Sequence, residues 1–220
     1  MNTMMRHVLT STVLLALFGI AGAGSVAVVH ELTKERIAAN IRATMLKSLN
    51  DVLPPSEYDN DILSDTIEVW DANLTPGAPT TIYRARKDGQ PVAAIFDINA
   101  PGGYGGSIHL LVGIRADGRL SGVRVVEHHE TPGLGDAIEA GKSDWILQFR
   151  GLSLDNPPEA QWKVKRDGGQ FDQFTGATIT PRAVVKAVRN ALRYYREHRD
   201  EIFTAPATPS AAEQEAESHE

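Results

Sequence analysis

The chain has 220 residues, of which 42% are hydrophobic and 23% are charged, which suits one globular domain with accessory segments. The absence of cysteine excludes a disulfide scaffold, a thiolate zinc site, an iron–sulfur cluster and a cysteine nucleophile, so a redox role would need a bound organic cofactor. The formal net charge of −6 and the lack of any block of lysine or arginine argue against a nucleic-acid-binding protein.

An apolar segment near the N-terminus, from Val8 to Val29, contains no charged residue. As a helix rising ~1.5 Å per residue it would reach about 33 Å, and the hydrocarbon core of a bilayer is roughly 30 Å thick. A cleaved signal peptide is the alternative, because Ala21-Gly22-Ala23 resembles a cleavage site of small residues. The apolar run is longer than a usual signal core, which favours an uncleaved membrane anchor.

The pattern after the anchor predicts that the helix continues as an amphipathic stalk and ends at Pro54-Pro55. The segment before the anchor is short and carries Arg6, which suits an N-terminus in the cytoplasm. We therefore expect everything after residue 30 to lie outside the cytoplasm. The apolar residues of the stalk recur every four positions: Ile37, Ile41, Met45, Leu49 and Leu53.

The middle of the chain predicts a mostly antiparallel sheet of about five strands. Asp-Gly pairs at 88–89 and 117–118 each lie between two apolar-rich runs, which is a signal for a hairpin turn. The predicted strands cover residues 66–70, 81–86, 92–98, 108–115 and 120–128.

Helices are predicted to follow the sheet, which makes the fold class α+β. Residues 135–149 are expected to be helical, with Ile138, Trp145, Ile146 and Phe149 as packing residues, and Gln161–Lys165 is expected to form another short strand. The last helix is predicted from Pro181 to His198, with Thr180 as N-cap and Pro181 in its first position. Its apolar stripe consists of Val184, Val188, Ala191, Leu192 and Tyr195.

The most informative segment for chemistry is Asp172–Pro181, a turn of small residues directly before a helix N-terminus. Unpaired amides and the helix dipole at such a position favour an anion, for example a phosphate. Gly176 and Ala177 leave room for a large group to approach Thr178. A plain tight turn followed by a helix cap remains the alternative.

Two further glycine-rich loops could contact a ligand. In Glu130-Thr131-Pro132-Gly133-Leu134-Gly135, two glycines flank an apolar residue, which suits a loop that packs against a flat group. In the loop Gly102–Ser107, the ring of Tyr104 could stack on such a group. Ordinary turns explain both loops equally well. The neighbouring pair His128-His129 is expected to be a solvated strand end, because adjacent strand residues point to opposite faces.

The sequence Asp-x-x-Thr-Gly-Ala-Thr at 172–178 resembles the flavinylation motif of the extracytoplasmic FMN-binding domain family. Gly-Tyr-Gly-Gly at 103–106, the run at 130–135, Trp145, Phe149 and the final helix follow in the order of that family. With its single N-terminal span, the chain to about residue 200 resembles the G subunits of Rnf-type ion-translocating electron transport complexes.

This resemblance implies that Thr178 carries FMN through a phosphoester bond. A flavin transferase of the ApbE type would move FMN from FAD to this threonine and release AMP, so Thr178 is a modification site and the chain needs no catalytic residue or metal of its own. Amides at residues 179–182 would receive the phosphodiester, and Asp172 would shape the loop or serve recognition by the transferase. The expected cofactor-binding residues are Thr178, Thr175, Gly176, Ala177, Glu130, Thr131, Gly133, Leu134 and Tyr104.

The function implied by the resemblance is that of an electron carrier anchored in the inner membrane, with its FMN in the periplasm. It would relay electrons between the ferredoxin- and NAD-linked subunits of the complex, coupled to ion transport. The C subunit of the sodium-pumping NADH:quinone reductase is the alternative within the family, and a non-redox membrane-tethered binding module is the alternative outside it. The expected segments are a cytoplasmic N-terminus (1–7), a transmembrane helix (8–29), a stalk helix (30–55), an FMN-binding domain (56–203) and a disordered acidic tail (204–220).

Overall fold

The computed structural model describes residues 3–208, and the chain divides into two compact units between Met45 and Leu46. The expected acidic tail from residue 209 onward lies outside the described residues. A single long helix, α1 (Thr3–Val52), begins in the first unit and ends in the second.

In the first unit, the apolar side chains of helix α1 are largely exposed. Leu15 and Phe18 each expose 76% of their surface. From Met5 onward the helix is long and apolar enough to cross a membrane, with a mean hydropathy of 2.2 in its most apolar stretch, and it is a candidate membrane span.

The predicted stalk is helical up to Val52, two residues before Pro54, which confirms the predicted helix and its end. Its apolar stripe is buried only in part. Ile37 and Ile41 are exposed by 51% and 64%, whereas Leu49 and Leu53 are fully buried in the second unit.

The second unit is built on a five-stranded antiparallel sheet in which each strand pairs with its neighbours along the chain, in the order β1-β2-β3-β4-β5. This confirms the predicted sheet. Asp88 and Gly89, at the first hairpin turn, have φ values of 50° and 75°, the backbone region that a two-residue hairpin requires. The strands are β1 (Thr66–Val69), β2 (Thr80–Lys87), β3 (Gln90–Ala100), β4 (Ile108–Arg115) and β5 (Leu120–Glu127).

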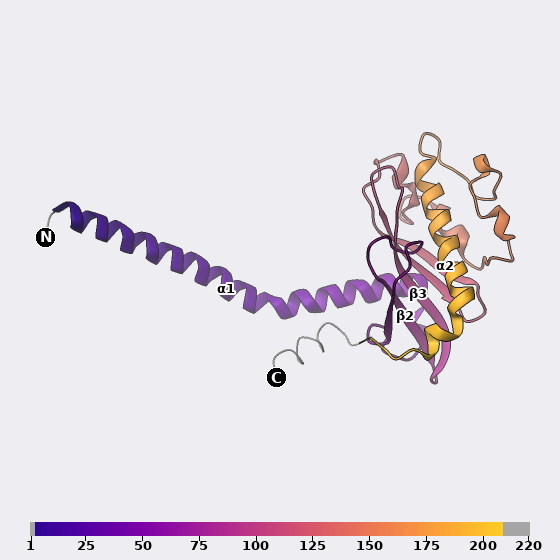
Figure 1. The fold of residues 1–220 in the computed structure, drawn as a ribbon, viewed down its shortest axis with the longest axis horizontal. Coiled ribbons are helices and arrows are strands. Elements are labelled where there is room, and N and C mark those ends of the chain that lie inside the picture. Colours follow the sequence, from indigo (N-terminus) through magenta and orange to yellow (C-terminus); the bar gives the residue numbers. More distant parts are fainter. Residues whose placement is uncertain (1–2, 209–220) are drawn as a thin grey trace. The chain divides into compact units, whose positions relative to one another are not determined.

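One face of the sheet is covered by the long C-terminal helix α2 (Ile179–Thr204), as Figure 1 shows. All residues of its predicted apolar stripe are buried in the core with side chains from β3 and β4. On the opposite face, the end of α1 packs closely, because a Cβ on Gly122 would lie 3.0 Å from the Val52 carbonyl oxygen. Helix α2 therefore covers one face of the antiparallel sheet, as is typical of the α+β class, and the last turn of α1 lies against part of the other face.

Helix α2 begins at Ile179, so the prediction that Thr180 caps it is wrong. Thr178 occupies the N-cap position, and the Thr180 hydroxyl donates instead to the Glu130 carboxylate. Pro181 lies in the third helical position, which it tolerates because the first four amides of a helix lack an intrahelical partner in any case.

The segment between β5 and α2 contains short 3₁₀ helices in place of the predicted helix and strand. The predicted helix over 135–149 is divided into η2 (Gly135–Ile138) and η3 (Asp144–Phe149). Ser143 separates them, since its hydroxyl donates to the Ala137 carbonyl at 2.6 Å and accepts from the Trp145 amide at 3.2 Å, which competes with continuous helical bonding. The four predicted packing residues are nevertheless all buried.

The predicted strand over Gln161–Lys165 is wrong. This region lies between two 3₁₀ helices, η4 (Glu159–Gln161) and η5 (Lys165–Asp167), and Val164 forms only an isolated bridge with Phe171. A five-residue alternating pattern cannot by itself distinguish a strand from consecutive turns. A further 3₁₀ helix, η1 (Pro55–Glu57), follows α1.

Both outer strands of the sheet are bonded to irregular segments. At the β1 edge, the Thr208 amide donates to the Thr66 carbonyl at 2.7 Å. At the β5 edge, the Leu120 amide donates to the Leu152 carbonyl and the Gly151 amide donates to the Leu120 carbonyl, each at 2.8 Å. The first residues after α2 thus lie along the sheet, although the expected disordered segment began at Thr204.

Candidate functional site

A cavity of about 310 Å³ opens at the N-terminus of α2. Three segments that are far apart in the sequence meet there: the loop after β3, the segment after β5, and the turn before α2. The cavity is at the small end of the size range for cofactor sites. Its lining residues are Tyr104, Glu130, Thr131, Leu134, Gly135, Gly176, Ala177, Thr178, Ile179 and Thr180.

The cavity brings together most of the residues that the sequence predicts for cofactor binding. Two predicted residues do not line it. Thr175 is exposed and precedes the lining turn, and Gly133 lies between lining residues with a φ of 78°. Gly135 also lines the cavity and was not predicted, whereas Ile179 and Thr180 were predicted only through their backbone amides.

Thr178 lies at the edge of this cavity with its side chain partly exposed. It occupies the N-cap position of α2, but its side chain makes no capping hydrogen bond. The preceding Gly176 has a φ of 81°, which lets the chain turn sharply before the helix. Thr178 therefore lies at a helix N-terminus, and its side chain is not used to cap the helix.

The walls of the cavity differ in character. Leu134 and Ile179 each expose 45% of their surface, and Tyr104 exposes 72%, so apolar and aromatic surface surrounds the opening. The Ile179 and Thr180 amides belong to the first turn of α2, where amides favour an anionic group. A flat apolar ring with a phosphate attached fits this combination, as FMN requires.

Glu130 is the buried charged residue of the cavity, with 5% of its surface exposed. Its carboxylate accepts a hydrogen bond from the Gly105 amide at 2.9 Å and another from the Thr180 hydroxyl. It thereby connects all three lining segments.

Glycine at position 105 permits this arrangement. A Cβ at Gly105 would collide with the backbone carbonyl of His129, so any side chain there would force the loop after β3 away from the end of β5. The sequence predicts that the loop Gly102–Ser107 could contact a ligand, but no local pattern indicates that Gly105 is the glycine next to the end of β5.

An aromatic cluster supports the turn that carries Thr178. The Trp145 indole nitrogen donates to the Asp172 carbonyl at 2.8 Å, and its ring meets Phe174 edge-on at 5.2 Å between centroids. Phe149 stacks on Phe171 at 4.9 Å and also contacts Trp145. The Asp172 side chain points elsewhere and pairs with Lys165 at 2.6 Å.

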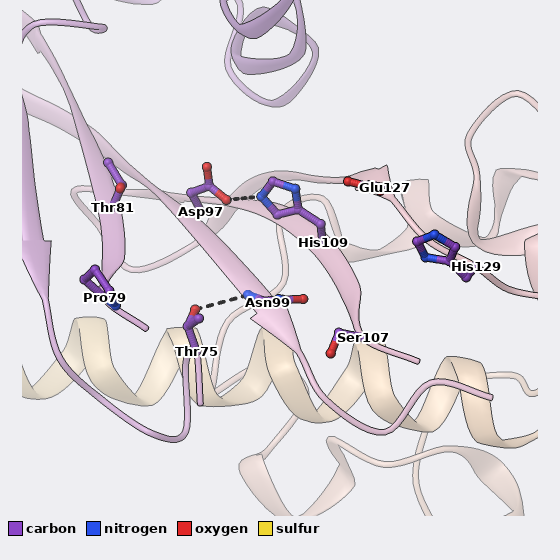
Figure 2. Close-up of a pocket in the computed structure, with 9 residues that line it drawn as sticks. All are labelled: Thr75, Pro79, Thr81, Asp97, Asn99, Ser107, His109, Glu127 and His129. Atoms are coloured by element: carbon purple, nitrogen blue, oxygen red, sulfur yellow. Dashed lines mark hydrogen bonds and ion pairs between the residues drawn. The ribbon is translucent and has the colours of Figure 1, made fainter. Parts of the chain in front are cut away.

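A second, more polar hollow of about 490 Å³ lies beside the ends of β3, β4 and β5 (Figure 2). In it, His109 pairs with Asp97, and the Asn99 amide donates to the Thr75 hydroxyl at 3.1 Å. The hydrogen bond to Asp97 raises the pKa of His109. Partial burial lowers this pKa, whereas the charges of Asp97 and Glu127 raise it further. Among residues 3–208, no group of three or more acidic, histidine or cysteine side chains is arranged to hold a metal ion.

The two adjacent histidines point to different surroundings, as predicted. His129 lines the polar hollow of Figure 2. The expectation of a solvated end is wrong for His128, whose side chain is 12% exposed and lies 2.8 Å from a Glu139 carboxylate oxygen.

Comparison with known proteins gives matches over both units. A family described as FMN-binding domain matches residues 103–193, and a family described as RnfG N-terminal region matches residues 1–52. Three similar proteins are each named as the G subunit of an ion-translocating oxidoreductase complex. The protein from Pseudomonas aeruginosa (strain UCBPP-PA14) is 48% identical over 98% of this chain and 97% of its own length. The corresponding values are 49%, 88% and 91% for the Yersinia pestis protein, and 42%, 92% and 97% for the protein from Vibrio cholerae (strain O395).

Proposed function

The chain belongs to the family of G subunits of ion-translocating oxidoreductase complexes, whose members are electron-transfer subunits with an FMN-binding domain, and we propose that it carries FMN covalently on Thr178 outside the cytoplasm. One observation carries this proposal. Thr178 lines the cavity at the N-terminus of α2, and its hydroxyl makes no capping bond.

Attachment would use a partner enzyme, because a threonine hydroxyl is a weak nucleophile and needs an activating base or metal ion. In a flavin transferase of the ApbE type, the Thr178 oxygen attacks the phosphorus atom on the riboflavin side of FAD. The bond between the two phosphates of FAD breaks, AMP leaves, and the hydroxyl proton is lost. Thr175 and Asp172, outside the cavity, are available to the transferase for recognition.

The chain's own residues would hold the cofactor and shape its surroundings. The first amides of α2 would receive the phosphodiester, and Leu134 and Ile179 would pack against the ring. FMN supplies reversible electron transfer, so the protein's task is positioning and electrostatic bias. Electrons would pass through this relay between the ferredoxin- and NAD-linked parts of an Rnf-type complex, and ion transport would occur in other subunits. The match to the RnfG N-terminal region and the name of the relatives favour this complex over the sodium-pumping quinone reductase.

The intact mass of the chain tests covalent attachment. Full-length protein co-expressed with a flavin transferase is expected to gain the mass of FMN less one water and a yellow visible spectrum, and protein made without the transferase is expected to lack both. An unmodified chain, alongside a second protein that the same transferase does modify, would contradict the proposal.

The orientation can be tested because the chain has no cysteine, so that a single engineered thiol reports its own side of the membrane. Lys186→Cys places a thiol on the exposed face of α2, and Met5→Cys places one near the N-terminus. In intact spheroplasts, a membrane-impermeant maleimide is expected to label the first variant at once and the second only after lysis. The reverse pattern would place the FMN-binding domain in the cytoplasm.

A further inference from the structure

Glu130 is buried in the wall of the cavity without a cation beside it. Its side chain forms no ion pair within the part of the chain that the structure describes, and 5% of its surface is exposed. Removing a carboxylate from water is costly unless a charge or hydrogen bonds compensate it. Within the described residues, hydrogen bonds rather than an ion pair therefore offset the cost of burying Glu130.

Hydrogen bonds fix the orientation of this carboxylate. One oxygen accepts from the Gly105 amide at 2.9 Å, and the other accepts from the Thr180 hydroxyl. An ionised carboxylate offers only acceptors, and both donors suit that form. The Glu130 amide in turn donates to the His128 ring at 3.0 Å, which fixes the backbone at the same point.

Two glycines leave the space that the carboxylate occupies. A Cβ on Gly103 would lie 2.6 Å from one Glu130 oxygen, and a Cβ on Gly135 would lie 2.7 Å from the other. Side chains at these positions would push the carboxylate out of the cavity wall. The loop after β3 and the segment after β5 thus both provide room for a charge at this place.

We propose that Glu130 is a positioning residue that holds one negative charge against the bound flavin and so lowers its reduction potential. This inference rests on the proposed function, because it concerns the cofactor held in the same cavity. Reduction adds electrons to the flavin, and a fixed carboxylate in a water-poor wall disfavours the added negative charge.

The test compares midpoint potentials of flavin-loaded full-length protein, measured by spectroelectrochemistry at pH 8. Glu130→Gln keeps the shape and removes the charge; its amide oxygen can still accept from the Gly105 amide, and the Thr180 hydroxyl can rotate to accept from its NH2 group. It is expected to increase the equilibrium constant for flavin reduction at least about tenfold, which corresponds to ~30 mV for a two-electron couple. Glu127→Gln is the matched control, because it removes the same charge three residues earlier at an exposed strand end, and its potential is expected to stay at the wild-type value.

A second variant keeps the inference testable if Glu130→Gln does not take up flavin. In Thr180→Val the side chain keeps nearly the same shape but loses the hydroxyl that donates to the Glu130 carboxylate. Because the carboxylate charge is then less compensated, the reduction potential of the flavin is expected to shift downward. The inference would be overturned if Glu130→Gln had the same reduction potential as the Glu127→Gln control. Where Glu130→Gln cannot be loaded with flavin, an unchanged reduction potential in Thr180→Val would overturn it. Wild-type protein that takes up no flavin would instead contradict the proposed function itself.

Discussion

Replacement of Thr178 with alanine is expected to remove all covalent flavin from the chain. Attachment needs a hydroxyl oxygen at the edge of the cavity, and alanine offers none, so the loss should be complete. Since the Thr178 side chain makes no capping bond, the substitution should leave helix α2 and the thermal stability of the apoprotein nearly unchanged. In-gel flavin fluorescence and the mass of the peptide containing residue 178 measure the effect.

Two control variants separate the acceptor from its surroundings. Thr178→Ser restores a hydroxyl and is expected to recover flavin on the same peptide. Thr175→Ala changes an exposed threonine three residues earlier and is expected to keep flavin on Thr178 wholly or in part. Undiminished covalent flavin in Thr178→Ala would show that another residue is the acceptor.

Replacement of Phe149 with alanine is expected to cause a large loss of stability in the FMN-binding domain. Its ring is fully buried and contacts Trp145, Phe171 and Trp162 at centroid distances of 5.4, 4.9 and 6.1 Å. Loss of a buried phenylalanine costs about 3–5 kcal/mol. In a domain of this size, that cost corresponds to a fall of about 10 °C in melting temperature.

The matched control is Leu147→Ala, in the same 3₁₀ helix. Leu147 exposes 46% of its surface, so its truncation should change the stability by roughly 0.5 kcal/mol or less. Differential scanning calorimetry of the two variants measures the difference. Because the aromatic cluster supports the turn that carries Thr178, Phe149→Ala should also take up flavin less completely. Equal melting temperatures for the two variants would contradict this account of the cluster.

The sheet and the last helix were predictable because local patterns determine them. Each Asp-Gly pair indicated a hairpin, and the meander that follows needs no information about distant pairing. The stripe of Val184, Val188 and Leu192 indicated the buried face of α2 in the same way. In both cases the period of the hydrophobic residues matches one regular element.

The region between β5 and α2 was not predictable in this way. Its 3₁₀ helices are held by contacts between residues distant in sequence, such as the bond from Trp145 to the Asp172 carbonyl, 27 positions away. The role of Thr180 was misassigned for the same reason. A Thr-Pro pair normally indicates a helix cap, but the Glu130 partner lies 50 residues earlier and overrides that preference. The role of Thr178 as the flavin acceptor remains a prediction.

The segments bonded to the outer strands have a consequence for the self-association of the domain. Unpaired strand edges invite other chains to add to a sheet, which leads to aggregation. Here the residues after α2 form a backbone hydrogen bond to the first strand at Thr66, and residues 151–152 form backbone hydrogen bonds to the last strand at Leu120. Without cysteines, the domain cannot depend on disulfide bonds to hold these edges. Its resistance to self-association should therefore depend on these two short backbone attachments.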